Sequence, residues 1–323
     1  MLRKFVTAGA VALGLVAGLG QAVARAEYPA KPIRFVAPFA PGSGSDVVAR
    51  VVAQYAGARL GQPMVVENMP GASGAIGAAN VARAAPDGHT VLLGSVTTHA
   101  ANQSLLKTLS YKPVADFEPV SKLGTVALAL LVHPSVPAAD VRELIAHAKA
   151  NPGKLTFASG SASSRVAAEM FRTMAGLDVL YVPYKSNPQA LTDLMSGQTS
   201  LAFADLAAAL PVVKSGKLRA LAVTTARRSP FAPTLPTMAE AGVPGYELTG
   251  WLAAYVPART PRPVVEMLNA AFRAALASEG AVTALERAGI EATPSTPEEL
   301  AAFSEAETKK WAEVVKAAGI EPE

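Results

Sequence analysis

Several residue types that carry reactive chemistry are absent or scarce in this chain of 323 residues. It has no cysteine, which excludes a disulfide framework, a thiolate zinc site, an iron–sulfur cluster and a cysteine nucleophile. Charged residues make up only 17% of the chain against 50% hydrophobic residues, too few for a disordered tail and enough for a sizeable core. Length and composition therefore indicate a globular protein of two lobes.

Motifs for catalysis, metal binding and nucleotide binding are missing as well. The sequence has no G-x-S-x-G nucleophile motif, and its four histidines lack the H-E-x-x-H spacing of metal sites. His99 falls at an expected strand end, where a lone histidine is usually structural. The glycine-rich segments match neither G-x-x-x-x-G-K-[ST] nor G-x-G-x-x-G. We therefore expect no catalytic residue, no metal site and no cofactor.

The N-terminus has the three-part layout of a secretory signal peptide. Arg3 and Lys4 precede a largely apolar run over residues 5–23, rich in Ala, Gly, Val and Leu. The run is followed by Ala24-Arg25-Ala26. A transmembrane anchor is the alternative, but the run contains four glycines and ends at a small-residue cleavage pattern, which favours export with cleavage. No second long apolar run follows. We expect residues 1–26 to be a signal peptide and the mature protein to lie in the periplasm.

Loss of this leader would remove most of the positive charge. The formal net charge is +4, from 29 basic and 25 acidic residues, and residues 1–26 hold three basic residues and no acidic one. The mature chain would then carry a net charge of +1, with its basic residues scattered. Because nucleic-acid binding needs a basic patch, we expect no nucleic-acid partner.

Short β-branched runs alternate with amphipathic helical patterns, which is typical of α/β lobes built on parallel sheets. We expect lobe 1 over residues 27–126 and 228–323, lobe 2 over residues 127–227, and the return crossing between lobes within residues 228–245. Ligands of such sheets bind at the carboxyl ends of strands, here in the cleft between lobes. Strands are expected over residues 33–37, 64–67, 90–93, 128–132, 155–158, 179–182, 201–203, 218–224 and 248–256.

Two glycine loops, residues 38–46 and 68–74, each follow a strand and lead into a helix. Glycine lets the backbone approach a ligand closely, and free N–H groups at a helix start attract carboxylate or phosphate oxygens. Glycine-rich loops are also common connections between a strand and a helix, so these loops alone do not decide whether the protein binds a ligand here. Hydroxyls and one carboxylate follow the other strands. The candidate ligand-binding residues are Phe39, Gly42, Ser43, Gly44, Ser45, Ala72, Ser73, Gly74, Ser95, Thr97, Ser159, Ser161 and Asp205.

Helix capping is the competing interpretation for some of these polar residues. It is the expected role of Ser163, and Asp205 is as well suited to cap the helix at Leu206 as to meet a ligand.

Motifs along nearly the whole mature chain resemble the Bug family, the extracytoplasmic solute receptors of tripartite tricarboxylate transporters. They occur in the order found in that family. The matching residues are Tyr28-Pro29-x-Lys31-Pro32-Ile33-Arg34, Pro38-Phe39-x-Pro41-Gly42-x-Gly44-x-Asp46, Val66-Glu67-Asn68-x-Pro70-Gly71-Ala72-x-Gly74, Ala85-Pro86-Asp87-Gly88, Val182-Pro183-Tyr184-Lys185, Gly216-Lys217-Leu218-Arg219-Ala220-Leu221-Ala222-Val223-Thr224 and Pro236-Thr237-x-Ala239-Glu240-Ala241-Gly242.

The resemblance implies a type II periplasmic binding fold, a Venus flytrap of two α/β lobes around a central cleft. It also implies that residues 39–46 and 70–74 hold a ligand carboxylate through backbone groups and ordered waters. Two positions depart from the family pattern. Ala204-Asp205 stands where many members have Asp-Asn, and Arg165 stands where many have His. A cation at 165 would favour a second carboxylate, and loss of the usual Asp weakens the case for a ligand amino group.

We therefore expect a monomeric solute-binding protein without catalysis. Its partners would be a small organic acid and the membrane subunits of a tripartite tricarboxylate transporter. A ligand-sensing input protein for a membrane signalling system, and a periplasmic enzyme on the same fold, are the competing functions.

Overall fold

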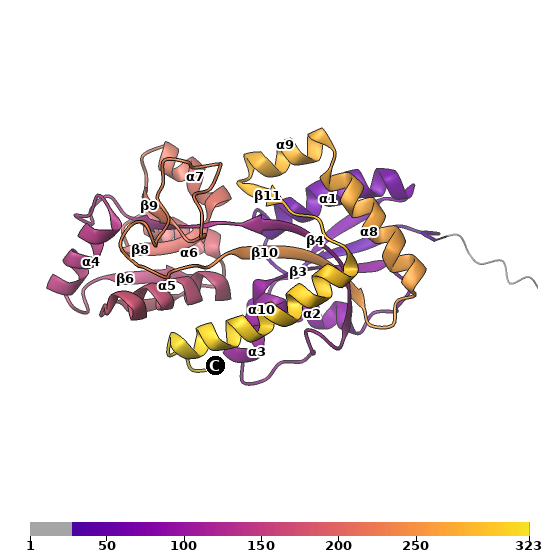
Figure 1. The fold of residues 1–323 in the computed structure, drawn as a ribbon, viewed down its shortest axis with the longest axis horizontal. Coiled ribbons are helices and arrows are strands. Elements are labelled where there is room, and N and C mark those ends of the chain that lie inside the picture. The colour runs from indigo at the N-terminus through magenta and orange to yellow at the C-terminus, as the bar shows by residue number, and fades with distance from the viewer. Residues whose placement is uncertain (1–27, 323) are drawn as a thin grey trace, which may run out of the picture.

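The computed structural model describes residues 28–322, which form two mixed β-sheets covered by helices (Figure 1). The signal peptide expected at residues 1–26 lies outside the described part. None of the helices within residues 28–322 is long and apolar enough to cross a membrane.

The first sheet has six strands in the order β11-β4-β10-β3-β1-β2. Strand β1 runs parallel to β2 and β3, whereas β10 runs antiparallel to β3 and β4. The strands are β1 (Ile33–Ala37), β2 (Met64–Asn68), β3 (Thr90–Ser95), β4 (Phe117–Val126), β10 (Gly250–Pro257) and β11 (Ile290–Ala292). Its helices are α1 (Gly44–Leu60), the 3₁₀ turn η1 (Ala72–Gly74), α2 (Ala75–Ala82), the π turn η2 (Thr97–Ala101), α3 (Asn102–Leu105), α8 (Arg262–Leu276), α9 (Glu279–Arg287) and α10 (Pro297–Ala317).

The second sheet has five strands in the order β7-β6-β8-β5-β9. Strand β6 runs parallel to β7 and β8, and β5 runs antiparallel to β8 and β9. The strands are β5 (Leu128–Val132), β6 (Thr156–Ser159), β7 (Leu180–Pro183), β8 (Leu201–Asp205) and β9 (Arg219–Val223). The helices are α4 (Val141–Ala150), α5 (Ala162–Ala175), α6 (Asn187–Met195) and α7 (Leu206–Lys214).

Side-chain alternation explains why both sheets are covered on both faces. Ile33, Phe35 and Ala37 of β1 point to the core under α1 and α8, and Val36, between Phe35 and Ala37, points to the opposite core. Helix α8 repeats buried apolar residues every three or four positions, so one face of it is apolar and packs on the sheet.

Three connections join the two lobes in the described part of the chain. Only Ala127 separates β4 of the first sheet from β5 of the second. Strand β10 returns to the first sheet, and its first residue, Gly250, pairs with Val126. The third connection is the end of α10, where the Thr173 hydroxyl donates to the Ala318 carbonyl at 3.4 Å.

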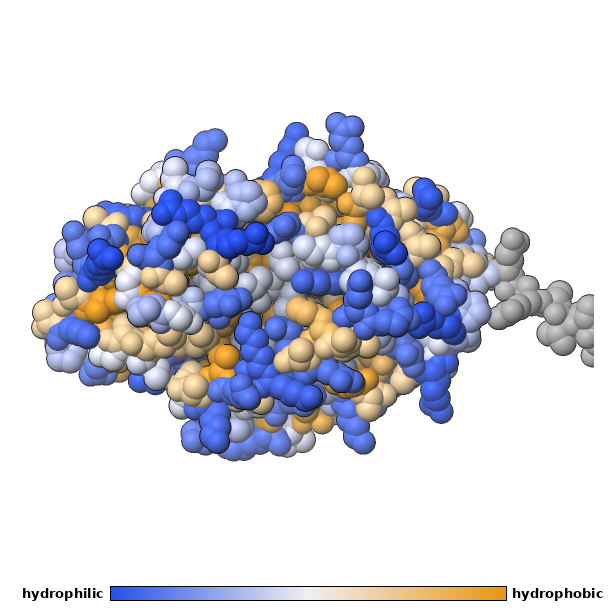
Figure 2. Space-filling model, in the orientation of Figure 1, coloured by the Kyte–Doolittle hydropathy of each residue, from blue (hydrophilic) through white to orange (hydrophobic). Residues whose placement is uncertain are grey.

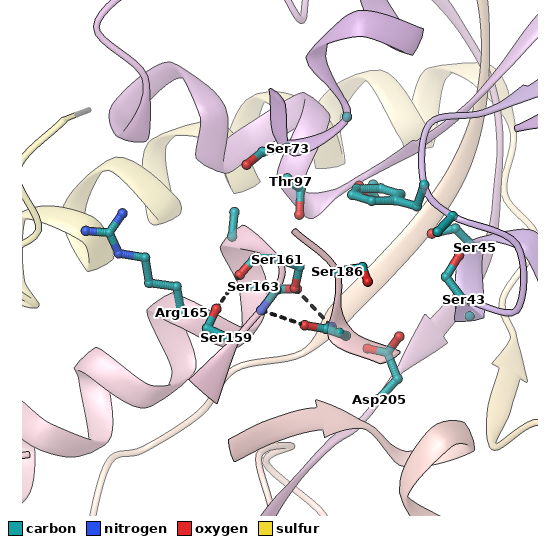
Figure 3. Close-up of a pocket in the computed structure, with 18 of the residues that line it drawn as sticks. Ser43, Ser45, Ser73, Thr97, Ser159, Ser161, Ser163, Arg165, Ser186 and Asp205 are labelled. Atoms are coloured by element: carbon teal, nitrogen blue, oxygen red, sulfur yellow. Dashed lines mark hydrogen bonds between the residues drawn. The ribbon is translucent and has the colours of Figure 1, made fainter. Parts of the chain in front are cut away.

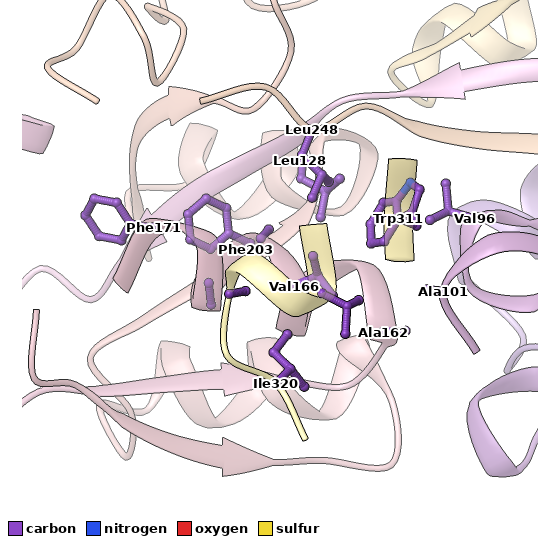
Figure 4. Packing of buried hydrophobic residues seen from close by; sticks show 14 of the residues in the cluster. Val96, Ala101, Leu128, Ala162, Val166, Phe171, Phe203, Leu248, Trp311 and Ile320 are labelled. Carbon is purple, nitrogen blue, oxygen red and sulfur yellow. The ribbon is translucent and has the colours of Figure 1, made fainter. Parts of the chain in front are cut away.

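A shared hydrophobic core accompanies these crossings. Trp311 and Ile320 belong to the same buried cluster as Phe171 and Phe203 of lobe 2 (Figure 4). The face shown in Figure 2 carries hydrophobic residues only in small patches between hydrophilic ones.

The structure differs from the sequence expectation in three respects. Both sheets are mixed rather than parallel, because β5 and β10 run against their neighbours. Strands β4 and β11 were not expected, and β4 forms much of the first crossing. The segment expected to cross back packs on lobe 2 instead: Met238 N–H donates to the Val223 carbonyl, and Leu248 N–H donates to Thr224. The return comes near Thr249, so we propose that lobe 2 extends to residue 248.

Candidate functional site

A cavity of about 680 Å³ lies between the two sheets, at the strand ends where the sequence places the cleft. Lobe 1 lines it with the loops that follow β1, β2 and β3, and lobe 2 lines it with the loops that follow β6, β7 and β8 (Figure 3). The crossing strands contribute Val126 and Gly250, so both lobes and the connection between them meet in one place.

The structure brings all thirteen predicted ligand-binding residues to this cavity. Those from lobe 1 are Phe39, Gly42, Ser43, Gly44, Ser45, Ala72, Ser73, Gly74, Ser95 and Thr97, and those from lobe 2 are Ser159, Ser161 and Asp205. Their contact with a ligand stays a prediction. The loop after β7 is not among the predicted binding segments, yet it lines the cavity with Lys185, Ser186 and Asn187. The strand, proline and helix pattern around Pro183 and Pro188 was the available signal.

The first glycine loop ends in the N-terminus of α1. Ser43 is the N-cap residue, and its hydroxyl accepts from the N–H of Asp46 at 3.3 Å. The first N–H groups of a helix have no acceptor within the helix. Among the described residues, the N–H groups of Gly44 and Ser45 also have no other acceptor. They are therefore available to an anion in the cavity.

The second glycine loop holds three consecutive residues in the left-handed region. Ala72, Ser73 and Gly74 have φ values of 46°, 52° and 81°. A side chain at Gly74 would strain the backbone and would also meet Thr98 Cγ2 at 2.9 Å. The side-chain amide of Asn102 donates to the Ser73 carbonyl at 3.1 Å and holds the loop in place. Within the described part of the chain, the N–H groups of Ala72 and Ser73 have no acceptor.

A polar network centred on the buried Asp46 joins the two glycine loops. The Asp46 carboxylate accepts from Gly42 N–H at 3.0 Å, from Asn68 Nδ2 at 2.9 Å and from Arg50 Nε at 3.0 Å. Asn68 Nδ2 also donates to the Phe39 carbonyl at 3.0 Å. Burial alone would raise the pKa of Asp46, but the hydrogen bonds from Arg50, Gly42 and Asn68 and the charge of Arg50 lower it overall. Asp46 therefore stays ionised and fixes both loops.

The third loop of lobe 1 follows β3 and begins with a closed turn of hydroxyl groups. Ser95 N–H donates to Thr98 Oγ1 at 3.0 Å, and Ser95 and Thr97 line the cavity. His99 lies outside it, stacked on Tyr255 with ring centroids 3.8 Å apart. Burial lowers its pKa to about 3, so His99 is a neutral side chain of the core.

Lobe 2 lines the cavity with a network of side chains around Asn187. Its Nδ2 donates to Ser161 Oγ at 3.2 Å, and its Oδ1 accepts from Ser164 Oγ at 3.0 Å and from Gly160 N–H at 3.1 Å. Ser161 caps α5 and forms a capping box with Ser164. The cap is therefore Ser161, whereas the sequence analysis gave that role to Ser163.

Asp205 ends β8 and is the N-cap residue of α7, yet its side chain makes no capping hydrogen bond. The half-buried carboxylate lies at the cavity instead (Figure 3). A Cβ atom built on Gly44 of the opposite lobe would be 3.0 Å from Asp205 Oδ2. Burial raises the pKa of Asp205 to about 6. The sequence left two roles open for the Asp205 side chain, capping of α7 and contact with a ligand. The structure does not show the capping hydrogen bond.

Two cationic side chains also line the cavity. Arg165 lies on α5 with its guanidinium carbon 4.8 Å from the ring centroid of Tyr181, and it extends away from Asp205 (Figure 3). Lys185 is exposed at the start of the loop before α6. No group of three or more His, Asp or Glu side chains suited to a metal ion occurs within residues 28–322.

Comparison with known proteins identifies the relatives of this arrangement. The family model described as tripartite tricarboxylate transporter family receptor matches residues 48–320. The chain belongs to this family. BugT of Bordetella pertussis is 37% identical over 306 residues, covering 94% of each chain.

Solved structures of relatives have the same fold. A protein of R. palustris with adipate superposes with a TM-score of 0.89 and is 36% identical, covering 92% of this chain and all of that one. MatC of Rhodopseudomonas palustris with bound malate has a TM-score of 0.84 and 33% identity, covering 89% of this chain and all of that one. The periplasmic binding protein BugD has a TM-score of 0.86 and 34% identity, with 92% of this chain and all of that one covered. The expected two-lobed periplasmic binding fold is confirmed, and the chain is a solute-binding protein of the Bug type.

Proposed function

We propose that this protein captures a small organic carboxylate between its lobes in the periplasm and delivers it to the membrane subunits of a tripartite tricarboxylate transporter. The carrying observation is the convergence of two glycine loops on one cavity, each with two N–H groups that lack an acceptor in the described structure. These are the N–H groups of Gly44, Ser45, Ala72 and Ser73. Main-chain N–H groups at a helix start and in a glycine loop are donors that suit the oxygens of a carboxylate.

The size and lining of the cavity agree with a solute of a few carbon atoms to about ten. Its volume of about 680 Å³ falls within the usual range for small-molecule pockets. Apolar groups of Phe39, Leu128 and Trp251 line it beside the hydroxyls, so the carbon chain of an acid would have apolar surface to contact. Adipate and malate, which the two R. palustris proteins hold, are acids of this size.

Capture by closure of the lobes is supported by the way the cavity is built. Its two walls come from different sheets, and within residues 28–322 the main chain between them crosses only at Ala127, near Thr249 and through the end of α10. A ligand that contacts both walls shifts the equilibrium towards the closed form, which a membrane partner can distinguish from the open form.

Calorimetric titration with a panel of mono- and dicarboxylic acids tests binding, with adipate and malate as the first probes. We expect at least one acid to bind, and its neutral amide, such as adipamide for adipate, to bind at least a hundredfold more weakly. Deletion of the gene should then abolish uptake of that acid. Equal binding of acid and amide, turnover of the acid, or unchanged uptake with lost gene induction would contradict the proposal.

A further inference from the structure

Asp205 is an acidic group placed where an anion is expected to bind. Its Oδ2 atom is 3.0 Å from the position of a Cβ atom on Gly44, whose N–H is one of the four donors of the glycine loops. It belongs to lobe 2, whereas Gly44 begins α1 of lobe 1. A carboxylate bound at that helix terminus would therefore meet a second carboxylate across the cleft.

Nothing in the described structure neutralises the Asp205 side chain. It accepts no hydrogen bond from α7, although it occupies the N-cap position, and it forms no ion pair with another described residue. Two carboxylates within a few ångströms of each other in a partly dehydrated site cannot both remain ionised without a large cost. One shared proton removes that cost and makes a hydrogen bond between them.

We propose, on the basis of the function inferred above, that Asp205 couples carboxylate capture to the uptake of one proton. The ionised side chain opposes closure of lobe 2 over an anion. The protonated side chain donates its O–H to the ligand carboxylate and adds a contact that holds the lobes together. The protonation state of Asp205 thus determines whether a ligand carboxylate can bind beside it, and therefore the pH range in which the receptor binds its ligand.

The surrounding charged groups do not account for the raised pKa of Asp205. On α1, Asp46 and Arg50 bond each other, and no charged residue of β5 packs against the site. Lys214 lies in the last turn of α7, Arg287 of α9 is exposed, and Lys185 of the loop before α6 is exposed. The pKa of Asp205 is raised to about 6 by burial, and none of these charges contributes to the shift. A bound anion would raise it further.

The sign of the pH dependence follows from this pKa. A ligand that raises the pKa of Asp205 binds more tightly when the proton is already present, so affinity increases as the pH falls from 8 to 6 and levels off below. The gain cannot exceed tenfold per pH unit, or about 50-fold over this range for an initial pKa of about 6. Simple carboxylic acids have pKa values of about 4, so the ligand itself stays largely ionised.

Calorimetry with adipate between pH 6 and pH 8, in buffers of different ionisation enthalpy, tests the coupling. We expect the affinity of the unaltered protein to increase at least fivefold over this range, with uptake of close to one proton per adipate at pH 7. Malate is the second probe. A change of less than about fivefold, or release of protons on binding, would overturn the inference even if binding itself is confirmed. Absence of binding by every acid of the panel would instead overturn the proposed function.

Two variants assign the effect to a residue. Asp205→Asn keeps a good N-cap residue and loses no hydrogen bond, so it should fold. It should bind adipate more tightly at pH 8, with less than twofold pH dependence and no proton uptake. Asp178→Asn removes a negative charge from the exposed surface of lobe 2, outside the cavity, and should behave like the unaltered protein. Weaker binding by Asp205→Asn would show that Asp205 pairs with a ligand cation, and would overturn the proposal.

Discussion

The two walls of the cavity are built from different chemical groups. Lobe 1 presents main-chain N–H groups of two glycine loops, which Asp46, Asn68 and Arg50 join, together with the side chains of Ser95 and Thr97. Lobe 2 presents side chains, namely the serine hydroxyls around Asn187 and the carboxylate of Asp205. A main-chain wall changes little when side chains are substituted, whereas a side-chain wall changes with each substitution. Lobe 1 is therefore suited to a carboxylate common to many ligands, and lobe 2 to discrimination among them.

The largest expected effect comes from closing the gap between the walls. Gly44→Val should reduce carboxylate affinity at least a hundredfold, because its side chain would fill the space before Asp205 Oδ2, 3.0 Å from the added Cβ atom. Calorimetry with adipate measures the loss, and far-ultraviolet circular dichroism confirms that the fold is kept.

A graded pair of variants shows whether contact between the walls is the cause. Gly44→Ala should weaken adipate binding, and the same change in an Asp205→Ala background should cost much less, because its nearest neighbour is then absent. Equal costs in both backgrounds would mean that the loop of lobe 1 is disturbed on its own.

A second prediction concerns the support of the main-chain wall. Asp46→Ala removes an acceptor that serves Gly42, Asn68 and Arg50, so it should lower the free energy of unfolding by about 2 kcal/mol and adipate affinity more than tenfold. Chemical denaturation and calorimetry measure the two effects. Loss of stability with unchanged affinity would show that the loops keep their geometry without the network.

Acid should weaken the stabilisation that Asp46 gives, whereas acid should strengthen the ligand affinity that depends on Asp205. Because the pKa of Asp46 is lowered overall, its contribution to stability is present above about pH 4 and is lost as the pH falls through its pKa in the folded protein. The stability of Asp46→Ala should therefore fall less than that of the unaltered protein as the pH is lowered below about 4.

The sequence could predict the main-chain wall better than the side-chain wall. Glycine, proline and small residues between a strand and a helix specify a backbone shape locally, so residues 38–46 and 68–74 were identified from their own composition. The pattern around Pro183 and Pro188 could have indicated the loop of Asn187 but not its contacts, because its partners Ser161 and Ser164 lie more than twenty residues away and meet it through the pairing of β6 with β7.

The crossings between lobes show a similar limit. The pairing of β4 with β10 contains two register irregularities, so its buried positions do not alternate strictly and its pattern lacks a clear period of two. The segment after β9 is rich in proline, which indicated a connection, but its hydrogen bonds to Val223 and Thr224 could not be read from composition.

A third, smaller effect separates two serines of the side-chain wall. Ser161→Ala removes the N-cap of α5 and a hydrogen bond to Asn187, so it should cost about 1 kcal/mol of stability and several-fold in adipate affinity. Ser163→Ala is the matched control, because Ser163 lines the cavity but does not cap the helix. Greater loss of stability from Ser163→Ala than from Ser161→Ala would contradict the assignment of the cap.

The smallest effect is spectroscopic and reports on the junction between the walls. The two tryptophans of the chain, Trp251 and Trp311, both donate to Glu307 Oε2, at 2.8 Å and 3.1 Å. Trp251 lines the cavity, whereas Trp311 lies on α10 away from it. Adipate should change the tryptophan emission by a modest fraction, and the change should persist in Trp311→Phe and vanish in Trp251→Phe. A change that persists without Trp251 would place the ligand-sensitive contact on α10, and would mean that closure of the lobes moves this helix.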